Sequence, residues 1–182
     1  IAPNRCAVYC RHCNRRRRWR ERERHLAPVE LEAVAGYIER RPALREVILS
    51  GGDPLTLSDG RLDRILARLR AIGHVEVLRI GSRMPAVLPM RITGRLCDML
   101  RTYRPLWFLT QFNHPREITP EAAAACERLL GAGIPVLNQS VLLKGVNDDY
   151  RTLRELLYGL ERISVKPYYL FQCEDVKGAA HF

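Results

Sequence analysis

The chain has 182 residues, of which 47% are hydrophobic and 27% are charged, and its formal net charge is +10 at pH 7. This length is sufficient for one domain, residues 1–182, with a hydrophobic core of its own. No apolar run of about 18 residues occurs, which excludes a membrane span on sequence grounds.

Much of the positive charge is local, because arginines concentrate between residues 11 and 24. A run of like charge is usually a solvated face, but beside a catalytic loop it can also hold carboxylates or phosphates. Charge alone would permit nucleic-acid binding, yet Trp19 is the single Trp, Tyr or Phe in the run. We therefore expect no nucleic-acid partner.

The first chemical motif is a cysteine loop, residues 6–13, in which Cys6, Cys10 and Cys13 have the spacing C-x3-C-x2-C. Three thiolates are one too few for a closed zinc site or for an ordinary cubane cluster. The spacing therefore favours a 4Fe-4S cluster with one iron open to a ligand. The alternatives are a zinc site completed by His12 or a distant cysteine, and a chance grouping.

The other cysteines, Cys97, Cys126 and Cys173, are isolated in apolar settings, and we expect them to be small buried residues. The six cysteines do not form a disulfide framework, so the sequence indicates the reducing cytoplasm.

Apolar periodicity predicts five strands that alternate with five helices. The predicted strands are residues 46–50, 75–80, 106–110, 134–143 and 164–171. The predicted helices are residues 28–41, 58–72, 93–103 and 150–163, with one more beginning at Thr119 and Pro120. Alternation of this kind is typical of parallel strands with crossover helices.

Polar residues follow each predicted strand, and in a parallel barrel these positions share the rim where active sites form. They are Asp53, Arg83, Gln111, Asn113, His114, Asn147 and Glu174. We therefore predict an α/β fold, an incomplete parallel (βα)6 barrel. Residues 1–3 would be the remnant of a first strand. The alternative is an open doubly wound sheet, although no dinucleotide-type glycine motif supports it.

A Gly-Gly-Asp-Pro turn, residues 51–54, follows the first predicted strand. Two glycines let a backbone approach a ligand closely, and Asp53 adds a charge. Turns of this composition are common, so the motif is informative only together with the cysteine loop.

Several longer blocks carry a more specific resemblance. They are C-x3-C-R-H-C-N-R-R-R from residue 6, V-I-L-S-G-G-D from 47, R-I-G-S-R-M-P-A-V-L-P-M-R-I from 79, Q-F-N-H-P-R-E-I-T from 111, N-Q-S-V-L-L-K-G-V-N from 138 and P-Y-Y-L-F-Q-C from 167. In this order they resemble the lysine 2,3-aminomutase family of radical S-adenosylmethionine (SAM) enzymes over nearly the whole chain. The resemblance implies a radical SAM core with a 4Fe-4S cluster, SAM and pyridoxal phosphate (PLP) as cofactors.

The resemblance also implies roles for individual residues. The cluster ligands would be Cys6, Cys10 and Cys13. SAM would be contacted by His12, Ser50, Gly51, Gly52, Asp53 and Gln139, with the loop 144–148 near the adenine. The substrate would be bound by Arg15, through its carboxylate, and by Glu174, through a distal ammonium group.

Two positions depart from the family pattern. Glu174 stands where the lysine enzymes have an aspartate, which keeps a cationic substrate plausible but puts lysine itself in doubt. Gln111 replaces a common histidine. We expect the lysine that binds PLP to lie beyond Phe182 and the arginines that hold its phosphate to precede Ile1, so that this chain lacks the PLP site.

The sequence thus supports three functional hypotheses. The first is a 2,3-aminomutase that acts on free lysine or a related amino acid, with a reductant such as flavodoxin or ferredoxin and with homo-oligomeric assembly. The second is the same chemistry on a lysine destined for translation elongation factor P. The third is a non-catalytic zinc- or nucleic-acid-binding module.

Overall fold

The computed structural model describes residues 2–182, and within them five parallel strands form one sheet in the order β1-β2-β3-β4-β5. The strands are β1 (Glu46–Leu49), β2 (Val77–Gly81), β3 (Leu106–Thr110), β4 (Val136–Leu142) and β5 (Lys166–Gln172). Each strand pairs with the next one along the chain. The five predicted strands are therefore confirmed, with ends that shift by one or two residues.

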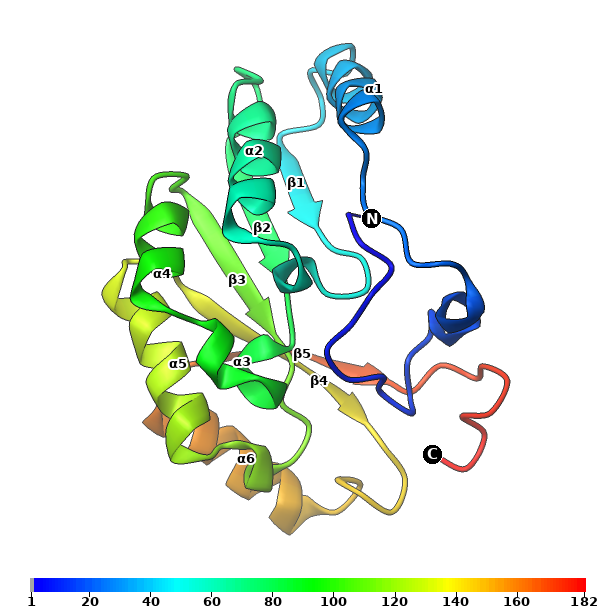
Figure 1. The fold of residues 1–182 in the computed structure, drawn as a ribbon. Helices are drawn as coiled ribbons and strands as arrows, with labels where there is room; N and C mark the ends of the chain where they lie inside the picture. The colour runs from blue at the N-terminus through cyan, green and yellow to red at the C-terminus, as the bar shows by residue number, and fades with distance from the viewer. Residues whose placement is uncertain (1) are drawn as a thin grey trace.

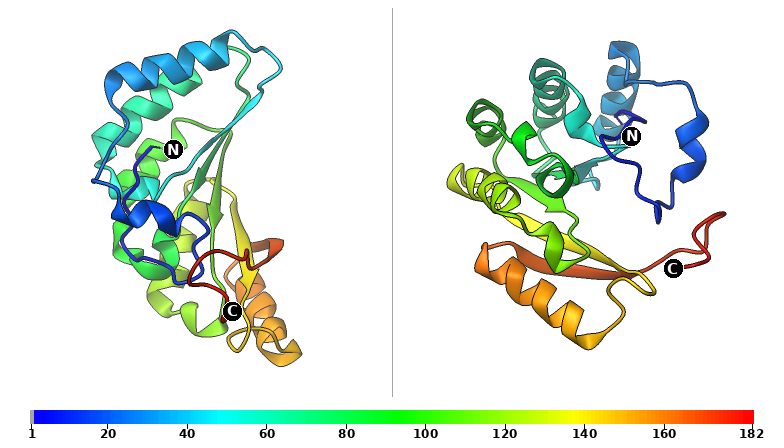
Figure 2. Two further views of the ribbon diagram at one scale, coloured as in Figure 1. Left: turned by 90° about the vertical axis from the view of Figure 1, so that its right-hand side faces the viewer. Right: turned by 60° about the horizontal axis from the view of Figure 1, so that its bottom comes forward.

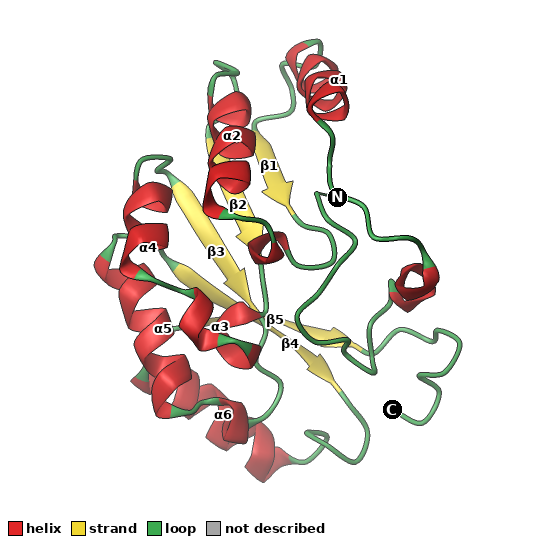
Figure 3. Ribbon diagram, viewed as in Figure 1, coloured by secondary structure: helices red, strands yellow, loops and turns green. Residues whose placement is uncertain are grey.

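One helix precedes β1, and the other helices occupy the connections between the strands (Figure 3). They are α1 (Pro28–Glu39), α2 (Asp59–Arg70), α3 (Met84–Val87), α4 (Gly94–Arg101), α5 (Pro120–Gly131) and α6 (Tyr150–Arg162). Short 3₁₀ turns are η1 (Arg16–Arg20), η2 (Pro54–Thr56), η3 (Pro89–Arg91) and η4 (Pro115–Glu117). The sequence did not predict α3, because four residues are too few to show helical periodicity.

The helices line the outer face of a curved sheet, and the two chain ends lie on its open side (Figures 1 and 2). A doubly wound sheet would carry helices on both faces and would reverse its strand order. Sequential strand order and one covered face instead define an incomplete barrel, as predicted. Between residues 2 and 182, no helix combines the length and apolar character needed to cross a membrane.

The core lies between the outer face of the sheet and the helices. Alternate strand residues such as Leu78, Ile80 and Phe108 are fully buried there. The opposite strand face is more open, since Ile48 of β1 is 51% exposed and Phe171 of β5 is 44% exposed. The sheet is thus packed as a barrel wall on the outside and accessible on the inside.

Residues 2–5 run beside residues 50–53, just beyond the carboxyl end of β1. The amide of Ala2 donates to the Ser50 carbonyl (2.8 Å), and the amides of Gly52 and Asp53 donate to the carbonyls of Pro3 and Arg5 (both 2.7 Å). On their other side, residues 2–4 pair with residues 24–26 in antiparallel fashion. Ala2 and Pro3 thus take the place of the predicted first strand, whereas Ile1 lies outside the described residues.

This pairing explains the two glycines of the turn. A Cβ on Gly51 would lie 2.3 Å from the Pro3 carbonyl oxygen, and a Cβ on Gly52 would lie 2.1 Å from that of Arg5. Real Cβ atoms do not tolerate such approaches to backbone, so both positions require glycine. The close approach that the sequence suggested for a ligand is therefore made, in the structure, by the chain itself.

We predict that Gly52→Ala will destabilise the fold by about 2 kcal/mol, because the methyl group must displace the backbone of Arg5. For a domain of this size, that corresponds to a fall in Tm of roughly 4–8 °C, measurable by calorimetry. Gly60→Ala is the matched control, since a Cβ at Gly60 meets no atom within 4 Å. Equal melting temperatures for the two variants would contradict the packing argument.

Candidate functional site

A cavity of about 370 Å³ lies at the carboxyl ends of the strands, between the rim of the sheet and the cysteine loop. All the residues predicted individually to bind the cluster, SAM or the substrate line it. These residues are Cys6, Cys10, His12, Cys13, Arg15, Ser50, Gly51, Gly52, Asp53, Gln139 and Glu174. The loop 144–148, which the sequence placed near a nucleotide, is not part of this lining.

The three cysteines of the loop are free, partly exposed thiols. The backbone turns tightly between them, with the Cys13 amide donating to the Cys10 carbonyl at 2.9 Å. Burial raises the pKa of Cys6 to about 11, with smaller contributions from Asp53 and from the other two thiols. Because metal ligation needs the thiolate, loading must displace this proton.

The donor set fits an iron–sulfur cluster in chemistry and in place. Cys6, Cys10 and Cys13 face one cavity, and no fourth cysteine between residues 2 and 182 lines it, which is the arrangement that leaves an iron open. Among the described residues, however, no three His, Cys, Asp or Glu side chains are gathered around one point for a metal ion. The three thiolates of such a cluster each bind a different iron atom, so cluster binding does not require them to converge on one point.

Asp53 holds the rim together from a buried position. Its Oδ1 accepts a hydrogen bond from the Leu55 amide (3.0 Å), and its Oδ2 accepts one from the Arg83 amide (2.9 Å). Burial raises the pKa of the Asp53 carboxyl, while these hydrogen bonds oppose that rise. The carboxylate thus fixes the η2 turn and the start of α3 relative to each other.

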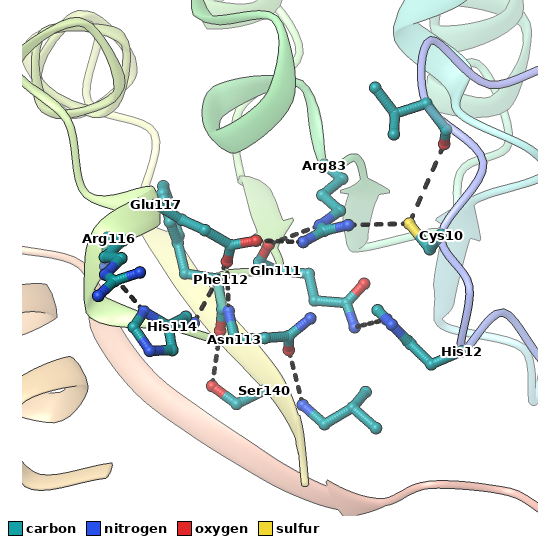
Figure 4. A network of polar contacts seen from close by, with 12 residues as sticks. Cys10, His12, Arg83, Gln111, Phe112, Asn113, His114, Arg116, Glu117 and Ser140 are labelled. Carbon is teal, nitrogen blue, oxygen red and sulfur yellow. Dashed lines mark hydrogen bonds and ion pairs between the residues drawn. The ribbon is translucent and has the colours of Figure 1, made fainter. Parts of the chain in front are cut away.

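Arg83 connects the rim to the cysteine loop (Figure 4). Its Nη1 lies 2.9 Å from the Cys10 sulfur, and its Nε donates to the Gln111 carbonyl at 3.2 Å. Its Nη2 forms an ion pair with Glu117. The sequence placed Arg83 on the rim, but only the tertiary structure brings it to a cysteine.

His12 faces Gln111 across the cavity, with 3.3 Å between His12 Nε2 and Gln111 Nε2. Burial, followed by the charge of Arg83, lowers the pKa of His12 to about 4, so the ring is neutral at pH 7. The Phe182 ring contacts His12 edge-on, with centroids 6.3 Å apart. A neutral, partly covered imidazole is suited to pack against a ligand ring.

Buried asparagine amides join the loop after β3 to β4 and to the loop that follows β4. Asn138 Oδ1 accepts from the Phe112 amide (2.7 Å), and Asn138 Nδ2 donates to the Phe112 carbonyl (3.1 Å). Asn147 Nδ2 bridges the carbonyls of Asn113 (2.7 Å) and Val141 (2.9 Å). Asn113 and Asn147 lie together just after β3 and β4, but both are buried and neither lines the cavity.

Gln139 turns into the cavity from the middle of β4. The ladder between β4 and β5 shifts register between Asn138 and Gln139. Independently of this shift, neighbouring residues of a strand point to opposite faces, so Asn138 is buried against Phe112 whereas Gln139 lines the cavity.

Arg15 and Glu174 lie on the same cavity although they are far apart in the sequence. Arg15 Nη2 donates to the Ser50 hydroxyl at 3.2 Å. Asn14 Nδ2 donates to Glu174 Oε1 at 3.0 Å, which joins the cysteine loop to the end of β5. A guanidinium and a carboxylate therefore line a single cavity.

The last residues of the chain fold back onto the cysteine loop and use part of the arginine run. Arg16 Nη1 donates to the carbonyls of Arg11 (3.0 Å) and Gly178 (2.5 Å). Arg11 lies 3.0 Å from His181 Nε2 and stacks on the Phe182 ring. At least these arginines are structural, which weakens the case for a nucleic-acid surface.

Comparison with known families identifies the class. The sequence pattern of the Radical SAM superfamily matches residues 1–157, and the chain belongs to that family. The enzymes of this family use a 4Fe-4S cluster and SAM. Two solved structures share the fold: Streptococcus suis SuiB bound to S-adenosylmethionine (TM-score 0.67, 17% identity, 99% of this chain and 41% of SuiB) and native anSMEcpe with bound AdoMet (TM-score 0.73, 12% identity, 96% of this chain and 50% of that one).

Closer sequence relatives are aminomutases. The chain is 49% identical to an L-lysine 2,3-aminomutase of Fusobacterium nucleatum subsp. nucleatum over 97% of its own length and 42% of the relative's. It is also 46% identical to a glutamate 2,3-aminomutase of Clostridioides difficile, over 98% of this chain and 42% of that protein. The resemblance to the lysine 2,3-aminomutase family is therefore confirmed. The chain spans less than half the length of these relatives.

We predict that the three cysteines outside the loop will differ in their reactivity toward an alkylating reagent. Cys126 is fully buried and burial raises its pKa to about 12, and Cys97 is also buried. Cys173 is only partly buried, so the expectation that all three are core residues was wrong for it. Iodoacetamide at pH 8 should modify Cys173 and spare Cys97 and Cys126 in the native, metal-free protein, as read by mass spectrometry. Denaturant should expose all three, and native modification of Cys126 would argue against this packing.

Proposed function

We propose that the protein containing this chain is a radical SAM 2,3-aminomutase whose substrate is lysine or a related amino acid with a cationic side chain. One observation carries the proposal: three thiols, the guanidinium of Arg15 and the carboxylate of Glu174 line a single cavity. The names of the relatives support the reaction but include both lysine and glutamate enzymes. The carboxylate of Glu174 favours the cationic substrate, because an anionic side chain would be repelled there.

We assign residues 1–182 as the radical SAM core. Cys6, Cys10 and Cys13 would hold the cluster, and His12, Ser50 and Gln139 would contact SAM, since each lines the cavity beside the loop. Gly51, Gly52 and Asp53 would shape the same wall. When bound, the cluster and SAM supply radical hydrogen abstraction, and PLP supplies the chemistry of amino-group migration.

The chain's own residues would bind and orient the substrate. The planar guanidinium of Arg15 is suited to a bidentate contact with the α-carboxylate. Glu174 would accept hydrogen bonds from the distal ammonium, and Asn14 holds one of its oxygens in place.

None of the three lysines of this chain is placed to bind PLP at the cavity. Lys144, Lys166 and Lys177 are exposed, and none of them lines the cavity. The PLP-binding lysine is thus assigned to the remaining part of the protein. We also propose an external one-electron reductant, a homo-oligomer and a cytoplasmic location, the last because all six cysteines are free thiols.

We predict that the anaerobically reconstituted protein will bind about four irons with matching sulfide, and that its EPR signal will change when SAM is added. Serine substitution of Cys6, Cys10 or Cys13 should remove most of this iron. Cys126→Ser is the matched control, because that thiol is buried away from the cavity. A single bound zinc would instead favour the zinc-module hypothesis. Iron retained in all three loop variants would mean that other residues bind the cluster.

We predict that Glu174→Gln will raise KM for lysine by about 10- to 100-fold with a smaller effect on kcat, because a charge-assisted contact is lost. Product analysis after incubation with lysine, SAM and reductant measures both constants. Asp175→Asn is the control, since its exposed carboxylate does not line the cavity. Turnover only of a lysine destined for elongation factor P would select the second hypothesis, and no β-amino product from either substrate would reject the proposal.

A further inference from the structure

A charged side chain that the proposed reaction does not use touches the cysteine loop. The side chain of Arg83 is only 17% exposed, and its Nη1 lies 2.9 Å from the Cys10 sulfur. Arg83 and Cys10 are 73 residues apart, so this contact is a product of the tertiary fold. An arginine is always charged, and placing one in a partly buried wall is costly unless its N–H groups are paired.

Three further contacts fix the direction of this guanidinium. Nε donates to the Gln111 carbonyl at 3.2 Å, Nη2 pairs with Glu117, and the backbone amide of Arg83 donates to Asp53 at 2.9 Å. These contacts tie Arg83 to the ends of β1 and β3 and to the η4 turn. They leave Nη1 directed at the cysteine loop (Figure 4).

Glu117 is itself held in place. Its other carboxylate oxygen accepts hydrogen bonds from the amides of Asn113 (2.6 Å) and His114 (3.4 Å). The ion pair is therefore a rigid unit, anchored in the loop after β3, rather than a mobile surface contact. A rigid unit can present a donor to one atom reproducibly, which a solvated arginine cannot.

A donor at this sulfur has a physical consequence for an iron–sulfur cluster. Hydrogen bonds to ligand sulfurs and nearby positive charge are among the factors that set a cluster's reduction potential. Reduction adds one negative charge, which a guanidinium beside a ligand stabilises. The reduced form is consequently favoured, and the potential rises.

We propose that Arg83 is a positioning residue that holds Cys10 at the rim and raises the reduction potential of the cluster bound by the cysteine loop. The inference rests on the proposed function, because it needs a cluster at Cys6, Cys10 and Cys13. It adds a residue outside the ligand set that controls how readily that cluster accepts an electron.

The test compares Arg83→Gln, Arg83→Lys and wild type in the full-length protein, reconstituted anaerobically. Iron and sulfide content report loading, and an EPR-monitored redox titration without SAM reports the midpoint potential. In Arg83→Gln the ratio of reduced to oxidised cluster at the wild-type midpoint should fall about tenfold, the effect of losing one charge-assisted hydrogen bond. Arg83→Lys keeps the positive charge but loses the planar guanidinium with its several N–H donors. Its ratio of reduced to oxidised cluster should therefore lie between those of wild type and Arg83→Gln.

Arg91→Gln is the matched control. Arg91 is also partly buried, at 20% exposure, and it pairs with Asp59 and with the carbonyls of Leu55 and Leu57. It has no contact with the cysteine loop among those the structure gives for residues 2–182. Its loss should therefore perturb packing to a similar degree and leave the potential unchanged.

The outcomes separate the inference from the proposed function. A wild-type protein without a cluster would reject the proposed function itself. If the wild-type protein binds the cluster but both Arg83 variants have the same midpoint potential as wild type, the proposed role of Arg83 is rejected and the proposed function is not affected. If Arg83→Gln does not bind the cluster, the test depends on Arg83→Lys. A midpoint potential of Arg83→Lys below that of wild type supports the proposal, and an unchanged potential rejects it. A shift of equal size in Arg91→Gln would assign the effect to general packing and also reject it.

Discussion

Three backbone hydrogen bonds between residues 2–5 and residues 50–53 hold the site together. They fix the start of the chain against the carboxyl end of β1, and the cysteine loop leaves from that point. Because Gly51 and Gly52 have no Cβ, the two backbones can pack at this distance. Without this pairing, Cys6 would have no fixed position relative to the rim, and the cavity would lose one wall.

Two buried or partly buried charged groups at the cavity, Asp53 and Arg83, have several partners each within the fold. Asp53 accepts hydrogen bonds from two backbone amides. Arg83 contacts the Glu117 carboxylate, the Gln111 carbonyl and the Cys10 sulfur. Buried charge is costly unless it is paired in this way. The same arrangement links the ends of β1, β2 and β3 to the cysteine loop, so the polar contacts that stabilise the rim also position the candidate site.

Much of the fold could be predicted from the sequence, because local patterns carry the information. Five apolar segments separated by helical periodicity require a parallel sheet with crossover connections, and the structure has that sheet. The short helix α3 and the exposure of Cys173 were not predictable in this way. Four residues show no period, and the burial of one thiol depends on what the rest of the chain packs against it.

The sequence by itself determined which chemistry is available, since the spacing of Cys6, Cys10 and Cys13 is a local property. It also placed polar residues after each strand, where a parallel sheet gathers them at one rim. Only the tertiary structure decided which of them face the cavity. Arg83 contacts Cys10 and Asn14 contacts Glu174, whereas Asn113 and Asn147 are buried and do not line the cavity. The physical reason is that such contacts join residues far apart in the chain, and strand register and loop packing, rather than sequence spacing, set their distances.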